Sequence, residues 1–141
     1  MAFGKGLIGV GVVVALGAAG FVLMPRSADA PVAAKGAPLV QVVLPELQGD
    51  AVIGARVFEA KCAACHGNNG TGVDGAGPPL IHKIYEPSHH GDAAFLAAAQ
   101  NGVRAHHWKF GNMLPIKAIT RAEVGMVVAY IRAVQQANGI N

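Results

Sequence analysis

The hydrophobic and polar residues of this chain divide it into three parts. Residues 7–24 are all apolar or glycine, residues 25–48 show no sustained period, and helical periods appear only after residue 49. The first run contains 18 residues, which as a helix would span roughly 27 Å, close to the hydrocarbon thickness of a bilayer. We therefore expect segment 1–24 to form a single N-terminal transmembrane helix.

A cleaved signal peptide is the competing interpretation of this first segment. Ala28-Asp29-Ala30 has the small-residue pattern of a cleavage site. The apolar run is longer than a usual signal core, however, and Pro31 would directly follow the cut, where proline is poorly accepted. Both features favour an uncleaved anchor.

The segment 25–48 has the composition of a linker. It carries prolines at positions 25, 31, 38 and 45 among alanine, valine and glycine. We expect an unstructured spacer, with the alternative that the apolar run Val40–Leu44 lies on the following domain or on a partner. A spacer of this kind tethers a domain and raises its effective concentration near the membrane.

Three helical patterns follow in the segment 49–141. The first begins at Asp50, the expected N-cap, and places Gly54 and Phe58 on one face. The second covers residues 92–100, and the third begins with the capping-box pattern Thr120–Glu123. A glycine inside a helix costs about 1 kcal/mol against alanine, so Gly54 indicates a close crossing with the third helix. The expected apolar face of that helix comprises Val124, Val127, Val128, Tyr130, Ile131 and Val134.

Both cysteines of the chain lie in one Cys-x-x-Cys-His pattern, formed by Cys62, Cys65 and His66. This is the attachment sequence of c-type haem, in which the thiols become thioethers and the histidine becomes an axial iron ligand. A disulfide and half of a zinc site are alternatives. Structural zinc needs four ligands, however, and a redox Cys-x-x-Cys accompanies a βαβ pattern that this sequence lacks. The sequence therefore predicts one covalently attached haem c.

The loop that follows the motif supports an all-α domain. Five glycines and two prolines between residues 67 and 79 exclude a strand there. Three helices enclose only a small core, so we expect the haem to supply much of the buried apolar surface. The chain without haem should then be poorly folded.

The segment 49–141 resembles the class I c-type cytochromes, here in a membrane-anchored form with one haem. Gly54 and Phe58 resemble the glycine and aromatic residue of the family's first helix, and Val127 and Tyr130 resemble the residues of the last helix that cross them. Two loops complete the resemblance: Gly77-Pro78-Pro79-Leu80 is similar to Gly-Pro-x-Leu, and Asn112-Met113-Leu114-Pro115 is similar to the distal loop. The fold that this resemblance implies is a small all-α cytochrome c domain around one haem.

The resemblance also implies roles for individual residues. The carbonyl of Pro78 would accept a hydrogen bond from Nδ1 of His66, and Leu80 would pack on the haem face. Met113 would be the sixth iron ligand, whose thioether favours ferrous iron. The implied cofactor-binding residues are Cys62, Cys65, His66, Pro78, Leu80 and Met113, and the implied metal ligands are His66 and Met113.

Five further histidines depart from the family pattern: His82, His89, His90, His106 and His107. One of them could replace Met113 and lower the potential, or the two adjacent pairs could bind a second metal ion. Positions at the surface or the haem edge are the simpler interpretation, because no sequence shows convergent geometry. Trp108 and Phe110 are expected to wall the haem pocket, and Lys61, Lys83, Lys109 and Lys117 to surround the exposed haem edge.

The charge of the chain limits its partners. The net charge is +3, and from residue 49 onward eight Lys/Arg stand against six Asp/Glu, which gives +2. Two haem propionates would roughly cancel that charge, so a nucleic-acid partner is not supported and steering of an acidic partner should be modest.

With both axial positions filled, no iron position stays open to a substrate, and we expect an electron carrier, not an enzyme. The resemblance implies a bc1-type donor, with a terminal oxidase, a photosynthetic reaction centre or a reductase as acceptor. Haem attachment needs reduced thiols outside the cytoplasm, so the domain should face the periplasm from a bacterial inner membrane. The alternatives are a fixed haem c subunit of a multi-subunit membrane oxidoreductase, and a haem enzyme or gas sensor.

Overall fold

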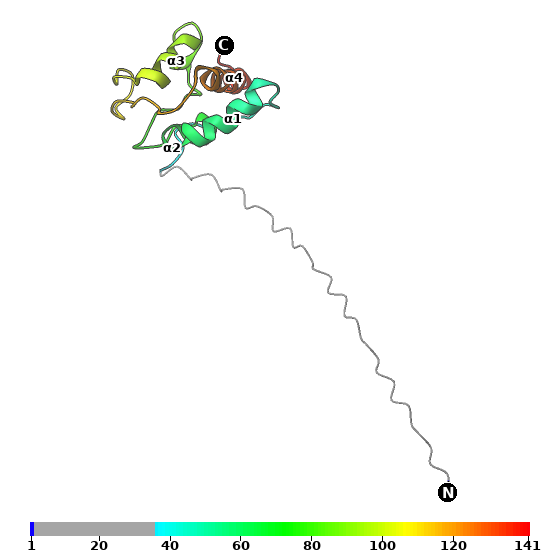
Figure 1. Cartoon of the computed structure of the whole chain (residues 1–141). Helices are drawn as coiled ribbons and strands as arrows, with labels where there is room; N and C mark the ends of the chain where they lie inside the picture. The colour runs from blue at the N-terminus through cyan, green and yellow to red at the C-terminus, as the bar shows by residue number, and fades with distance from the viewer. Residues whose placement is uncertain (2–35) are drawn as a thin grey trace.

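The computed structural model describes Met1 and residues 36–141, so the expected transmembrane run 7–24 and the alternative cleavage site lie outside the described residues. In the described part, the chain forms a cluster of helices joined by long loops (Figure 1). The elements in order are α1 (Asp50–Lys61), α2 (Ala63–His66), the 3₁₀ turns η1 (Asn68–Gly70) and η2 (Lys83–Tyr85), α3 (Asp92–Asn101) and α4 (Arg121–Ala137).

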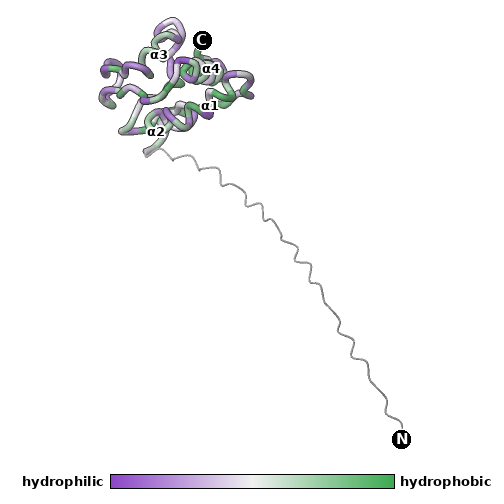
Figure 2. The backbone as a smooth tube through the Cα atoms, viewed as in Figure 1, coloured by the Kyte–Doolittle hydropathy of each residue, from purple (hydrophilic) through white to green (hydrophobic). Residues whose placement is uncertain are grey.

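The expectation of a helical domain is confirmed for residues 36–141. The β pairings found there are two isolated bridges, Val73 with Gly77 and Val103 with Met113. Hydrophobic and hydrophilic residues are mixed along the helices (Figure 2). Among the helices described, none combines the length and the hydropathy that crossing a bilayer requires.

The crossing of α1 over α4 is the centre of the fold. A Cβ atom on Gly54 would overlap the backbone carbonyl of Met126, so the close approach predicted for this glycine is confirmed. One turn further along, the rings of Phe58 and Tyr130 pack with centroids 5.5 Å apart. All six apolar residues predicted for the inner face of α4 are buried, from Val124 to Val134.

The sequence predicts the N-terminus of α4 correctly but not that of α1. The capping box of α4 is present, with Thr120 as N-cap and Glu123 returning the hydrogen bond. The expectation for α1 is wrong, because Gly49 is the N-cap and Asp50 is the first helical residue, with no side-chain cap. Gly49 has a φ of +54°, which glycine adopts without strain, and the carboxylate of Asp50 still faces the positive end of the helix dipole.

Replacing Thr120 with alanine is expected to destabilise the domain by about 1 kcal/mol, the usual effect of losing an N-cap side chain. The backbone N–H of Thr120 donates to Glu123 at 2.7 Å, and its hydroxyl donates at 2.8 Å. These bonds lower the pKa of Glu123 from its ordinary value of 4.5. Their stabilisation is therefore present above that value and is lost as the pH falls through the lowered pKa. Thermal unfolding of both proteins at neutral and acid pH should show the difference shrinking in acid.

Part of the expected linker is attached to the domain. Residues 36–48 form no helix or strand, but Val43 exchanges two hydrogen bonds with the side chain of Asn138 at the end of α4, at 2.9 and 2.8 Å. Leu39 and Val40 donate backbone hydrogen bonds to Thr71. The free-spacer expectation is therefore wrong for these residues, and the alternative that the apolar run lies on the domain fits them, because Val42 and Leu47 pack against the core.

Candidate functional site

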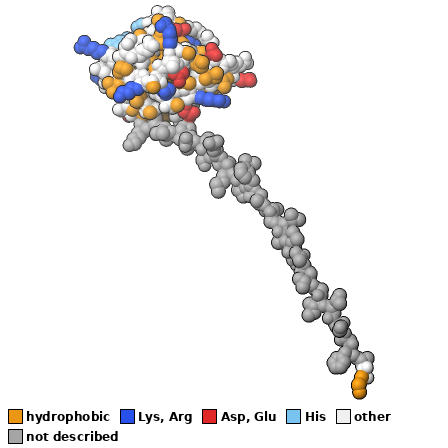
Figure 3. All heavy atoms as spheres, viewed as in Figure 1, with side chains coloured by type: hydrophobic (Ala, Val, Ile, Leu, Met, Phe, Trp, Pro, Cys, Tyr) orange, Lys and Arg blue, Asp and Glu red, His pale blue; other side chains and the backbone are white. Residues whose placement is uncertain are grey.

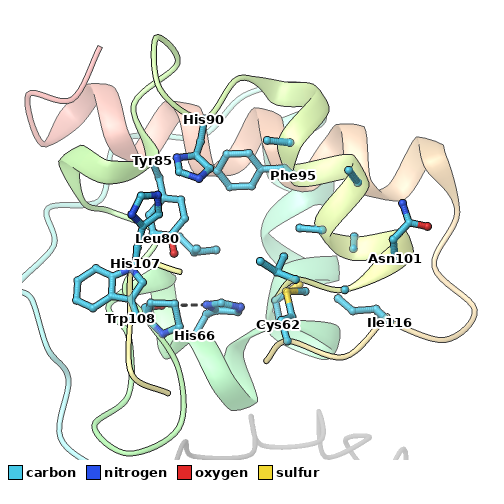
Figure 4. A pocket seen from close by; sticks show the side chains of 18 of the residues that line it. Cys62, His66, Leu80, Tyr85, His90, Phe95, Asn101, His107, Trp108 and Ile116 are labelled. Atoms are coloured by element: carbon cyan, nitrogen blue, oxygen red, sulfur yellow. Dashed lines mark hydrogen bonds between the residues drawn. The ribbon is translucent and has the colours of Figure 1, made fainter. Parts of the chain in front are cut away.

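The Cys-x-x-Cys-His motif forms the corner between α1 and α2. Cys62 ends α1 with its N–H bonded to the Phe58 carbonyl at 2.8 Å, and its own carbonyl accepts from the N–H of His66 at 2.9 Å. This turn directs Cys62 and His66 into a cavity of about 450 Å³ (Figure 4). Cys65 is exposed and does not line that cavity. The two sulfur atoms are not joined, so the disulfide alternative is not supported.

His66 is held in one orientation by the loop that follows the motif. Its Nδ1 lies 2.9 Å from the carbonyl oxygen of Pro78, which is the hydrogen bond that the family resemblance implies. Burial lowers the pKa of His66, and the hydrogen bond to Pro78 partly opposes that change. A neutral ring that donates through Nδ1 leaves the lone pair of Nε2 free to bind a metal. Gly77 allows this arrangement, because a Cβ there would meet the carbonyl of Cys65.

Met113 lies at the base of the loop 103–113, which follows α3 and is far in sequence from His66. Its N–H and carbonyl pair with those of Val103 at 2.9 and 3.0 Å, and both residues line the cavity. Gly102, with a φ of +76°, permits this closure, since a side chain there would press on the Met113 carbonyl. After the loop, the N–H of Ile116 bonds to Ala99 on α3. The structure thus brings Met113 to the same cavity as His66, while its role as sixth ligand stays a prediction.

The cavity has the size and the lining of a haem site. Its volume is that of a cofactor site, and its walls are mostly apolar or aromatic, including Leu80, Phe95 and Phe110. Among the described residues, the one buried side-chain polar atom without a hydrogen-bond partner is Nε1 of Trp108, on the cavity wall. Burial raises the pKa of the neighbouring Tyr85 hydroxyl, and the indole of Trp108 partly offsets this without completing a hydrogen bond. An amphiphilic group with an apolar body and acidic substituents would supply an acceptor for the indole N–H of Trp108.

Most of the predicted site residues meet at this cavity. Cys62, His66, Pro78, Leu80 and Met113 line it, as do Trp108 and Phe110, whose role as pocket walls is confirmed. The four lysines predicted around a haem edge are not among the lining residues. Cationic side chains on the visible face are scattered, not gathered in one patch (Figure 3). Their part in partner binding therefore stays a prediction.

The sequence analysis missed a buried polar network behind the cavity. Gln135 is fully buried on α4, and its side-chain amide donates to the carbonyls of Leu80 and Tyr85 at 2.9 and 3.1 Å. Arg132 donates to Tyr85 at 2.7 Å and to the carbonyl of His90 at 2.6 Å, and pairs with Asp92 at 2.9 Å. The available signal was a glutamine spaced four residues from Ile131, inside the apolar stripe of α4. The network fixes the backbone that carries Leu80, Tyr85 and His90.

Replacing Gln135 with leucine is expected to destabilise the holoprotein by about 2 kcal/mol, because the Leu80 carbonyl loses its donor inside the core. Tyr85 keeps its bond to Arg132, which limits the loss. Gln136, the exposed neighbour, is the matched control, and its change to leucine should stay within about 0.5 kcal/mol. Denaturant unfolding followed by haem absorbance measures both. Equal effects for the two variants would contradict the network's contribution.

A helical domain with a haem-attachment motif at an apolar cavity defines a c-type haem protein. The model of the Cytochrome c family matches residues 51–135, and the chain belongs to that family. No curated protein and no solved structure matches the chain. Membership means that the domain binds covalently attached haem c, for which Cys62 and Cys65 supply the attachment motif. It also implies haem-based electron transfer and, in general terms, redox partners.

Proposed function

We propose that this protein is a membrane-anchored one-electron carrier of a respiratory or photosynthetic chain. It would accept electrons from a bc1-type complex and deliver them to a terminal oxidase, a reaction centre or a reductase. The observation that carries the proposal is that the His66 and Met113 segments line one apolar cavity from separate parts of the chain. Two protein ligands to one iron leave no coordination position for a substrate, so no turnover of its own is proposed.

Each residue at the cavity has a defined task in this proposal. Haem c, when bound, supplies one-electron chemistry at its iron. His66 would bind the haem iron through a ring nitrogen, and the Pro78 carbonyl keeps that ring oriented and its donor strength high. Met113 would bind the iron through its thioether sulfur, which would raise the reduction potential. The apolar walls would exclude water from the site and would favour the less charged ferrous state of the bound haem.

The location belongs to the proposal as well. The apolar run 7–24 would anchor the chain in a bacterial inner membrane, and the haem domain would face the periplasm, where thioethers form. Since residues 36–48 lie on the domain, the tether between membrane and domain would be shorter than the full segment 25–48. A short tether favours exchange between neighbouring complexes over long-range diffusion.

Carbon monoxide binding by the reduced, full-length protein tests the carrier proposal. A carrier with two protein ligands should show an unchanged absorption spectrum under carbon monoxide at neutral pH. The same protein should also be reduced rapidly by a purified bc1-type complex and reoxidised rapidly by a membrane oxidase. A carbon monoxide complex would overturn the carrier proposal and favour the gas sensor or enzyme.

Membrane extraction tests the anchor. Full-length protein should stay with the membrane in alkaline carbonate and enter solution only with detergent, at the mass of the complete chain plus one haem. Release by carbonate, or a mass lacking the first 30 residues, would overturn the anchor. Purification only as part of a larger stable complex would overturn the carrier in favour of the fixed subunit.

A further inference from the structure

Four histidines from two separate loops meet at one edge of the haem cavity. His89 and His90 precede α3, and His106 and His107 lie in the loop closed by the Val103–Met113 bridge. The ring centroids of His107 lie 5.2 Å from both His89 and His90, and those of His89 and His90 are 4.6 Å apart. Figure 4 shows His90 and His107 beside each other, and Figure 3 shows histidine side chains at the surface.

We propose that His89, His90 and His107 bind one divalent transition-metal ion of the imidazole-preferring type, Zn²⁺ or Cu²⁺, separate from the haem iron. One nitrogen from each of these rings lies within 4.8 Å of the other two. This site goes beyond the proposed electron carrier and does not depend on it.

The distances suit a metal after a small adjustment. Zinc–nitrogen bonds of about 2.0–2.1 Å in a tetrahedral site place the nitrogens roughly 3.3 Å apart. The three nitrogens therefore need to close by at most about 1.5 Å, the difference between the two separations. His89 and His107 are exposed, so rotation of their side chains achieves this without moving the core. Three neutral nitrogen ligands leave a fourth position for water, as in open zinc and copper sites.

A hydrogen bond to the backbone fixes the ring of His90. Its Nδ1 lies 2.6 Å from the carbonyl of Ile84, so this nitrogen carries the proton and Nε2 keeps its lone pair. Histidine ligands of metals commonly donate their second nitrogen to a backbone carbonyl in this way. The carbonyl of His90 is in turn held by Arg132 at 2.6 Å. The half-buried His90 is therefore held in place by Ile84 and by Arg132 of α4, and it gives the site one rigid ligand.

The loop that carries His107 is also fixed. The Val103–Met113 bridge closes it, and the side chain of Asn112 accepts from the N–H of Ala105 at 2.9 Å. His106 lies in the same loop, with its ring 4.3 Å from that of His107, but its nitrogens fall outside the three-residue group. A bound ion would therefore connect this loop to the segment before α3.

The test is metal binding by the full-length, untagged holoprotein. Calorimetric titration with Zn²⁺, and equilibrium dialysis with Cu²⁺, should each give one ion per chain. Changing His89 or His107 to glutamine should weaken binding more than roughly 100-fold, since even second-sphere partners are worth about 10- to 100-fold in affinity. Nitrogen hyperfine structure in the Cu²⁺ paramagnetic resonance spectrum should report three imidazoles in the wild type and two in either variant.

His106→Gln is the matched control, because it removes an adjacent imidazole of the same loop. It should leave the affinity within about threefold, a small change against the loss of a ligand. Far-ultraviolet circular dichroism that matches the wild type, since the described domain is helical, shows that each variant is folded. Absence of stoichiometric binding, binding that persists in His89→Gln and His107→Gln, or an equal loss in His106→Gln would each overturn the site.

Discussion

Gly54→Ala is expected to destabilise the holoprotein by about 3 kcal/mol, although alanine is the better helix former by about 1 kcal/mol. The added Cβ would overlap the backbone carbonyl of Met126 and crowd the N–H of Val127. A backbone carbonyl cannot rotate away as a flexible side chain can, so α1 must separate from α4. That separation also loosens the packing of Phe58 on Tyr130. Guanidinium unfolding, followed by haem absorbance and by circular dichroism, measures the loss.

Gly125→Ala provides the matched control for this result. Gly125 lies inside α4, and a Cβ there meets no atom within 4 Å. The same chemical change should therefore stabilise the protein by up to about 1 kcal/mol through helix propensity alone. Opposite signs for the two variants would establish that the helix crossing, and not the glycine itself, sets the effect. Stabilisation by Gly54→Ala would contradict the close crossing.

The elements that the sequence predicts well are those with local causes. The capping box at Thr120 and the apolar stripe of α4 depend on residues three and four apart, and the structure has both. Gly54 is a longer-range case that was still predictable, because a glycine with a cost inside a helix indicates a close partner. The haem-attachment motif is predictable because it is local: its two thiols and its histidine are close neighbours in sequence.

The features that were not predicted depend on contacts between distant segments. Residues 36–48 read as a spacer because their stabilising partner, Asn138, lies 95 residues away from Val43. Asp50 and Gly49 both suit an N-cap position, so the sequence does not decide between them. The positive φ of Gly49, which does decide, is a property of the folded backbone. The two adjacent histidine pairs are visible in the sequence, but their convergence is not, since they come together only when two loops close.

One loop connects the haem cavity with the histidine cluster. The Val103–Met113 bridge holds Met113 at its base, while His107 and Trp108 lie near its tip. Desolvation, followed by the positive charge that neighbouring imidazoles can carry, lowers the pKa of His107. A lowered pKa favours the neutral form of this ring, which is the form that binds a metal ion.

Met113→His is expected to lower the reduction potential by on the order of 0.2 V, within the roughly 0.8 V range that axial ligation covers. Met113 lines the cavity that His66 enters from α2, and its backbone is fixed by the bridge to Val103. Imidazole is a stronger donor to ferric iron than a thioether, so the oxidised state should gain stability. The far-red band that iron–thioether bonds give in the oxidised protein should disappear, while the spectrum stays low-spin. Spectroelectrochemical titration of the full-length protein measures both changes.

Met126→Leu is the control for this substitution. Met126 lies in α4 and is not among the residues that line the cavity, so its change should leave the potential and the far-red band unaltered. An unchanged potential in Met113→His would show that Met113 is not a ligand. In that case His90, His106 and His107, which also line the cavity, become the candidates for the sixth position. A wild type without the far-red band would point to the same residues, because a histidine pair at the iron produces no thioether band.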